Sequence, residues 1–106
     1  MSYRFMRVIV FFDLPMKTNE DLREYTKFRK FLIRDGFLMM QKSVYSKLAL
    51  NQTAAGAVCD RVKAHCPAEG WVQILTITEK QFCSMEYVIG EKISDVMDSD
   101  ERMIVL

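Results

Sequence analysis

The segment Arg7-Val8-Ile9-Val10-Phe11-Phe12-Asp13-Leu14-Pro15 decides how this chain begins to fold. Its Val, Ile and Phe content predicts a buried strand over Arg4–Phe12. Asp13 follows at the strand end, and Pro15 marks a loop. A carboxylate at a strand end suits a magnesium ion, but a single carboxylate is a poor metal site on its own. Two interpretations of Asp13 are therefore open: it acts in a pair across a dimer, or it only shapes a turn.

Size and charge limit the possibilities. The chain has 106 residues, of which 50% are hydrophobic and 27% are charged, which is typical of one globular domain. A domain of this size buries a modest core, so dimerisation would stabilise it. The formal net charge is only +1, which excludes a protein that binds nucleic acid through overall charge. Any nucleic-acid contact must come from a local cluster of cations.

The cysteines do not form a metal-binding or disulfide pattern. Cys59, Cys66 and Cys83 contain no CxxC pair, and the one histidine, His65, completes no zinc-ligand spacing. We interpret them as reduced thiols. The first apolar run ends at Asp13, too short for a signal peptide or a membrane span. We therefore expect a soluble cytoplasmic protein. No nucleophile motif and no phosphate-cradling glycine loop is present in the sequence.

Helix signals follow the first loop. Thr18 is a good N-cap, and Glu20 and Asp21 suit the positive end of the helix dipole. The helix is predicted to run to about Arg34 and to stop at Asp35-Gly36. A strand region is predicted next, over Phe37–Leu50, with a bend at Met39-Met40-Gln41. A second helix is predicted from the N-cap Asn51 to near His65. A strand over Trp71–Thr78 and a connection over Glu79–Phe82 follow.

This order predicts an α+β fold, a ferredoxin-like βαββαβ sandwich in one domain spanning residues 1–106. Two short apolar segments, Met85–Ile89 and Arg102–Leu106, flank the acidic stretch Asp95–Glu101. The terminal apolar segment is predicted to be an extra strand. It pairs either with the sheet edge of a partner chain or within its own chain.

The predicted first helix carries a basic stripe, opposite an apolar face formed by Tyr25, Phe28 and Leu32. At about 100° per residue the cations fall within about 60° of one another. They are Arg23, Lys27, Lys30 and Arg34, with Lys42 and Lys47 on the next strand region able to extend them. The stripe is either a solvated face, partly balanced by Glu20 and Glu24, or a contact for a phosphate backbone. Nothing in it indicates base-specific readout.

Asp13 likewise has two interpretations. A turn-forming aspartate after a strand is common. Metal-assisted phosphodiester hydrolysis would instead need oxygen ligands and Mg²⁺, and two Asp13 side chains at a two-fold axis would supply two carboxylates. Ser43 and Tyr45 could add hydroxyl groups nearby, or could serve only in sheet pairing. His65 is not expected to reach Asp13 as a general base.

Four segments together resemble the family of CRISPR-associated protein two, in the right order and over nearly the whole chain. They are Val8–Pro15, Phe28–Leu32 followed by Asp35-Gly36-Phe37, Gln41-Lys42-Ser43-Val44-Tyr45-Ser46-Lys47, and Thr76-Ile77-Thr78-Glu79-Lys80-Gln81-Phe82. The wording of the last two is similar to the branch that accompanies single-chain RNA-guided effector nucleases. The residues beyond Gly90 are less family-like, and the second aspartate that some members carry near the first is absent.

The resemblance implies a ferredoxin-like homodimer whose C-terminal strand, within residues 91–106, joins the partner protomer. It implies a role in CRISPR adaptation, in which the dimer bridges two dimers of the integrase, CRISPR-associated protein one, and holds a short double-stranded DNA for insertion into the repeat array. It also implies a metal-dependent endonuclease acting on RNA or DNA, with Asp13 as the Mg²⁺ ligand and catalytic residue. We favour the DNA-bridging scaffold. The alternatives are the Mg²⁺-dependent nuclease and a toxin-like small ribonuclease that acts without an integrase.

Overall fold

A computed structural model describes residues 4–90 of the chain. Its elements, in chain order, are β1 (Met6–Asp13), α1 (Asn19–Arg34), β2 (Leu38–Gln41), β3 (Val44–Ala49), α2 (Gln52–Ala64), β4 (Trp71–Thr78) and α3 (Glu79–Cys83). The strands form one antiparallel sheet in the order β2-β3-β1-β4. This confirms the predicted α+β class and the ferredoxin-like βαββαβ arrangement.

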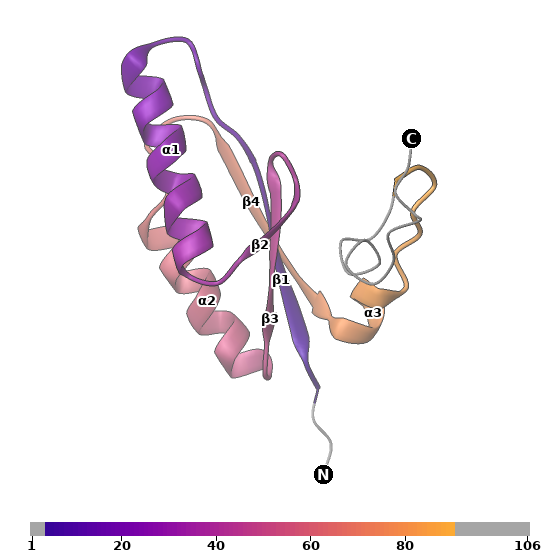
Figure 1. Cartoon of the computed structure of the whole chain (residues 1–106). Coiled ribbons are helices and arrows are strands. Elements are labelled where there is room, and N and C mark those ends of the chain that lie inside the picture. The colour runs from indigo at the N-terminus through magenta and orange to yellow at the C-terminus, as the bar shows by residue number, and fades with distance from the viewer. Residues whose placement is uncertain (1–3, 91–106) are drawn as a thin grey trace.

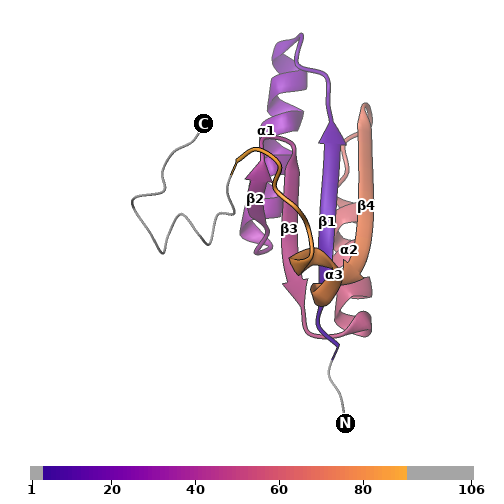
Figure 2. The ribbon, with the colours of Figure 1, turned by 90° about the vertical axis from the view of Figure 1, so that its right-hand side faces the viewer.

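The molecule has two main layers. Helices α1 and α2 lie together against one face of the sheet, which we call the inner face (Figure 1). The short helix α3 lies on the other side of the sheet, which we call the outer face (Figures 1 and 2). The two faces can therefore carry different functions.

Strand β1 lies in the centre of the sheet, between β3 and β4. Because side chains alternate along a strand, its residues divide between the two faces. Met6, Val8, Val10 and Phe12 are buried in the core under the helices. Their neighbours in the sequence, including Asp13, consequently point to the outer face.

Local capping explains where the helices begin. The Thr18 hydroxyl accepts a hydrogen bond from the Asp21 N–H at 3.0 Å, and the Asp21 carboxylate accepts one from the Thr18 N–H at 3.1 Å. This reciprocal capping box satisfies donors that the first turn of α1 leaves free. The Asn51 side chain caps α2 by accepting a hydrogen bond from the Ala54 N–H at 2.8 Å. Both predicted N-caps are confirmed.

Apolar side chains of the two helices complete the core. Phe28 and Leu32 of α1 and Val58 and Val62 of α2 are buried against the inner face. The predicted bend in the second strand region is confirmed as a register irregularity between Met39 and Gln41, within β2.

The region after β4 differs from the prediction. Glu79–Cys83 is a helical turn rather than a simple connection, because Thr78 and Gln81 form a second capping box. An ion pair anchors this turn to β1. Arg7 donates two hydrogen bonds to the Glu79 carboxylate, at 2.8 and 2.6 Å, and its guanidinium lies 4.3 Å from the centroid of the Phe82 ring.

One strand boundary is also corrected. Asp13 is the last residue of β1 rather than the first residue of a loop, since it pairs in register with Trp71. Residues 85–89 form neither a strand nor a helix. The expected extra strand at Arg102–Leu106 lies outside the described residues. No helix within residues 4–90 is long and apolar enough to cross a membrane.

Tyr45 provides a test of the core. Its side chain is 0% exposed and stacks on Phe12, with ring centroids 5.6 Å apart, yet its hydroxyl has no hydrogen-bond partner among the described residues. A buried, unpaired hydroxyl destabilises the folded state. We expect Tyr45→Phe to raise the free energy of unfolding by about 1 kcal/mol, as measured by urea denaturation.

Tyr25→Phe is the matched control, because Tyr25 packs against the same Phe12 ring but is only half-buried. It should change stability little. A clear loss of stability in Tyr45→Phe, with Tyr25→Phe unchanged, would mean that the Tyr45 hydroxyl has a partner and would contradict the packing described here.

Candidate nucleic-acid interface

The predicted basic stripe exists as an exposed ridge on α1. We call Arg23, Lys27, Lys30 and Arg34 the α1 ridge. All four side chains are exposed, and none makes an ion pair with another residue of the 4–90 range. The ridge lies on the side of α1 that faces away from the sheet, because Phe28 and Leu32 occupy the opposite side. It is therefore free to contact a partner molecule.

The ridge borders a shallow groove on the outside of α1. The groove is lined by Asn19, Leu22 and Thr26 together with Arg23, Lys27 and Lys30. Small polar and apolar side chains thus lie directly beside the cations. Such a surface can accept a phosphate on the ridge and the adjoining sugar in the groove.

The two lysines expected to extend the stripe lie elsewhere. Lys42 is exposed in the β2–β3 turn, at the same end of the sheet as Asp13, since the neighbouring Ser43 carbonyl accepts a hydrogen bond from the Phe12 N–H at 3.1 Å. Lys47 is half-buried and forms an ion pair with Asp35, whose backbone carbonyl it also binds. Lys47 is therefore engaged within the fold by Asp35, which offsets its charge only in part because Asp35 also pairs with Arg61.

Asp35 joins three elements at the C-terminal end of α1. Besides Lys47 of β3, it binds Arg61 of α2 through two hydrogen bonds, from Nε at 2.8 Å and from Nη2 at 3.2 Å. Burial opposes ionisation of Asp35, but the hydrogen bond from Arg61 and the charges of Lys47 and Arg61 outweigh it, so the pKa of this carboxyl is lowered. The same bond raises the pKa of Arg61.

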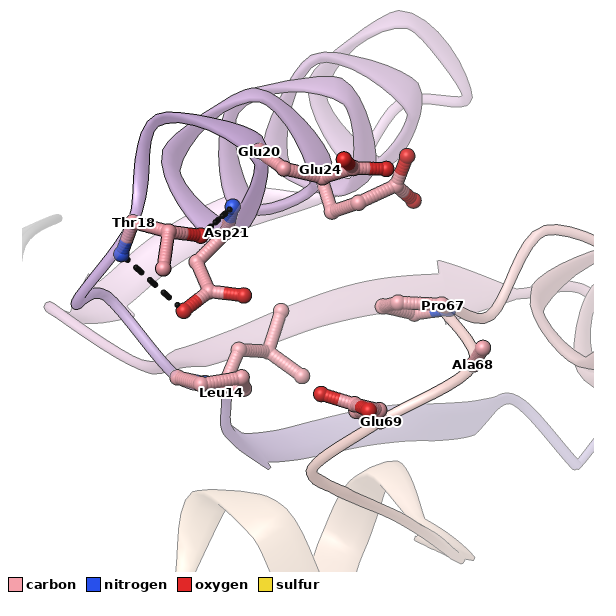
Figure 3. A pocket seen from close by; sticks show the side chains of 9 residues that line it. Leu14, Thr18, Glu20, Asp21, Glu24, Pro67, Ala68 and Glu69 are labelled. Atoms are coloured by element: carbon pink, nitrogen blue, oxygen red, sulfur yellow. Dashed lines mark hydrogen bonds between the residues drawn. The ribbon is translucent and has the colours of Figure 1, made fainter.

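An acidic pocket lies at the other end of α1. It has a volume of about 440 Å³ and opens between the first turns of α1 and the loop that joins α2 to β4. Figure 3 shows the carboxylates of Glu20, Glu24 and Glu69 around it, with Leu14 and Pro67 beside them. Because these carboxylates repel phosphate, the pocket forms a negative boundary near the N-terminal end of the ridge.

Asp13 lies on a different surface from the ridge. It is exposed at the end of β1 and points to the outer face, where its cross-strand neighbour Trp71 is 72% exposed. Three further apolar side chains on this face are exposed: Phe11 on β1, Leu48 on β3 and Leu75 on β4. The outer face is thus an apolar surface with Asp13 at one end.

The hydroxyl groups suggested as neighbours of Asp13 do not both approach it. Tyr45 lies in the core on the inner face, so the sequence-based suggestion was wrong for this residue, because strand alternation points it away from Asp13. Ser43 lies in the turn beside the end of β1 and is half-buried. His65 belongs to the helical layer, where its ring stacks on Phe31 with centroids 4.0 Å apart.

Residues 4–90 of one protomer do not form a complete Mg²⁺ site: this range holds no group of three His, Cys, Asp or Glu side chains arranged to hold a metal ion. Asp13 offers one carboxylate, whereas Mg²⁺ bound by a protein commonly uses more oxygen ligands from side chains or substrate. Further ligands would have to come from outside this group of residues, for example from Asp13 of a second copy of the chain.

Sequence reasoning missed Arg61, Asp35 and Glu69. Asp35 and Arg61 are 26 positions apart, and no local pattern links them. Sequence reasoning considered Glu20 and Glu24 only as a partial balance for the basic stripe, and the contribution of Glu69 required the packing of the α2–β4 loop near that helix.

Comparisons with known proteins agree with the resemblance seen in the sequence. The family described as CRISPR associated protein Cas2 matches residues 6–85. The CRISPR-associated endoribonuclease Cas2 of Treponema denticola is 52% identical over 101 residues, which cover 95% of this chain and 100% of the relative. The protein of the same name from Streptococcus mutans serotype c (strain ATCC 700610 / UA159) is 48% identical, covering 95% of this chain and 93% of the relative. The one from Ligilactobacillus salivarius is 45% identical, covering 95% and 100%. With most of its length matched at this level, the chain belongs to the CRISPR-associated Cas2 family.

Proposed function

We propose that this protein is a dimeric, non-catalytic scaffold of CRISPR adaptation. It holds a short DNA duplex and bridges dimers of the integrase, CRISPR-associated protein one. The observation that carries this proposal is the α1 ridge: its cations are exposed and without ion-pair partners in the described range, on a chain with a net charge of only +1. Membership in the Cas2 family supports the assignment to CRISPR systems.

The apolar outer face supports the dimer. Large exposed apolar patches mark interaction surfaces, and here Trp71, Leu75, Leu48 and Phe11 lie on one face of the sheet. A second copy bound to this face would cover these side chains. The α1 ridge lies in the layer on the opposite side of the sheet, so two ridges would remain exposed on the outside of such a dimer. That arrangement suits the bridging of a duplex.

The length of the ridge matches a phosphate backbone. Arg23 and Arg34 are eleven positions apart, which corresponds to about 16 Å along the helix axis. A DNA strand places a phosphate about every 7 Å along its own path, so the ridge can contact two or three consecutive phosphates. These contacts would give affinity without base readout.

An endoribonuclease is the second candidate, supported by two observations. The curated relatives carry that name, and Asp13 is exposed at a strand end on the face proposed for dimerisation. Two Asp13 carboxylates brought together by the dimer would form a better Mg²⁺ site than either alone.

Charge reversal on the ridge tests the scaffold. We expect the double variant Lys27→Glu and Lys30→Glu to bind a short labelled DNA duplex more weakly, because two phosphate contacts are lost. The slope of log Kobs against log salt concentration should become shallower by about 1.8, as measured by fluorescence anisotropy over a salt series.

The matched control is Lys63→Glu and Lys80→Glu, which changes the net charge equally at two exposed lysines of α2 and α3. It should retain the wild-type slope. If the control loses as much affinity and slope as the ridge variant, duplex binding depends on overall charge and the ridge is not the interface.

Asp13→Asn tests the nuclease. If this second candidate holds, the wild-type protein cleaves single-stranded RNA with Mg²⁺ and not with a chelator, and Asp13→Asn loses cleavage while it remains folded and dimeric. Cleavage should be followed on denaturing gels, and dimerisation by sedimentation. Equal cleavage by both proteins would assign the activity to another site or to a contaminant.

A further inference from the structure

We infer that Arg61 of α2 is a fifth phosphate contact, which continues the α1 ridge onto the second helix, and that Asp35 is the residue that positions it. This inference rests on the proposed contact between the ridge and nucleic acid. We call Arg34, Asp35, Lys47 and Arg61 the cationic corner.

The corner has an excess of positive charge. Asp35 is the only carboxylate in residues 4–90 that pairs with Lys47 or Arg61, and it serves both of them, while Arg34, adjacent in the sequence, has no ion-pair partner in that range. Two cations therefore share one carboxylate, and Arg34 adds a third positive charge at the neighbouring position of the sequence. Such a surplus attracts an anion to this end of α1.

Arg61 is placed to receive that anion. Its side chain is 45% exposed, whereas that of Asp35 is only 13% exposed. Nε and one Nη2 hydrogen are used by Asp35, and the guanidinium has no other hydrogen-bond partner within the described part of the chain. A guanidinium held in this way loses little conformational freedom when it binds a phosphate, for which its planar shape is well suited.

The packing of α2 on α1 brings Arg61 to the C-terminal end of α1, where it binds Asp35, the residue after Arg34. His65, one turn after Arg61, lies flat on Phe31 of α1, with ring centroids 4.0 Å apart, and its Nδ1 is 2.9 Å from the Arg61 carbonyl oxygen. Since the carbonyl only accepts, His65 Nδ1 is the donor. This contact fixes the last turn of α2 against the ridge-bearing helix.

The opposite end of the ridge is unfavourable for phosphate. Glu20, Glu24 and Glu69 surround the acidic pocket near the first turns of α1 (Figure 3). A nucleic-acid strand on α1 is consequently repelled at this end and attracted at the cationic corner. Contacts should therefore be strongest from Lys30 and Arg34 to Arg61, and weaker at Arg23.

Salt-dependent duplex binding tests the role of Arg61. We expect Arg61→Gln to make the slope of log Kobs against log salt shallower by about 0.9 and to weaken binding roughly eightfold at 0.1 M salt, which corresponds to one released counterion. The matched control is Lys63→Gln, which removes one charge from the same helix at an exposed position that has no ion pair within residues 4–90. It should leave the slope unchanged.

Asp35→Asn tests positioning separately from charge. The substitution makes the protein more positive, so attraction by net charge alone would tighten the complex. If Asp35 positions Arg61, Asp35→Asn should instead bind the duplex more weakly than wild type, because the Arg61 contact is lost. Its salt slope should then be close to that of Arg61→Gln. Thermal unfolding of each variant identifies any that fails to fold. Arg61→Lys keeps the charge but not the fork geometry of the guanidinium, so its affinity for the duplex should lie between those of wild type and Arg61→Gln.

Three outcomes are informative. A shallower slope in Arg61→Gln but not in Lys63→Gln supports the inference. An unchanged slope in Arg61→Gln, together with the expected loss in the Lys27→Glu and Lys30→Glu variant, overturns the fifth contact and leaves the ridge intact. Unchanged slopes in both overturn the proposed interface as well.

Discussion

The central position of β1 is the constraint on which the arrangement of this protein depends. Because β1 forms hydrogen bonds with a strand on either side, its side chains have only two directions available. Val8, Val10 and Phe12 pack against the helices on the inner face, and the residues that alternate with them point to the outer face. This division directs Asp13 toward the apolar outer face and leaves the outside of α1 for other partners. The two functions we propose, dimerisation and nucleic-acid binding, can thus occupy separate surfaces of one small domain.

The helical layer has its own electrostatic organisation. Cations line the outward side of α1, and carboxylates surround the pocket near the first turns of this helix. At the C-terminal end of α1, Asp35 forms ion pairs with both Lys47 and Arg61. The ion pair between Arg7 and Glu79 performs a similar structural task on the outer face, where it holds α3 against β1 and lowers the pKa of Glu79 through the Arg7 hydrogen bond. Charged residues therefore both fix the packing and define which surfaces attract anions.

Features determined by neighbouring residues could be predicted from the sequence. Thr18 and Asn51 act through hydrogen bonds within three positions, so both helix starts were predicted correctly. The Thr78–Gln81 capping box was equally local and was overlooked, which is why α3 was expected to be a connection. Strand alternation predicts that Val44 and Tyr45 point to opposite faces of the sheet. Only the packed fold determines that Tyr45 is the one that faces the helices. Similarly, the ridge follows from helical spacing alone, whereas the ion pair that links Arg61 to Asp35 depends on contacts between residues distant in the sequence.

The most direct test of a scaffold role is an integration assay with the cognate integrase, a short DNA duplex and a target that contains the repeat. Wild-type protein, Asp13→Ala and the ridge variant Lys27→Glu and Lys30→Glu would be compared, each shown to be folded and dimeric. A non-catalytic scaffold requires that Asp13→Ala supports integration as well as wild type and that the ridge variant does not. Failure of Asp13→Ala, with full activity of the ridge variant, would contradict the scaffold and place the chemistry of Asp13 at the centre of the function.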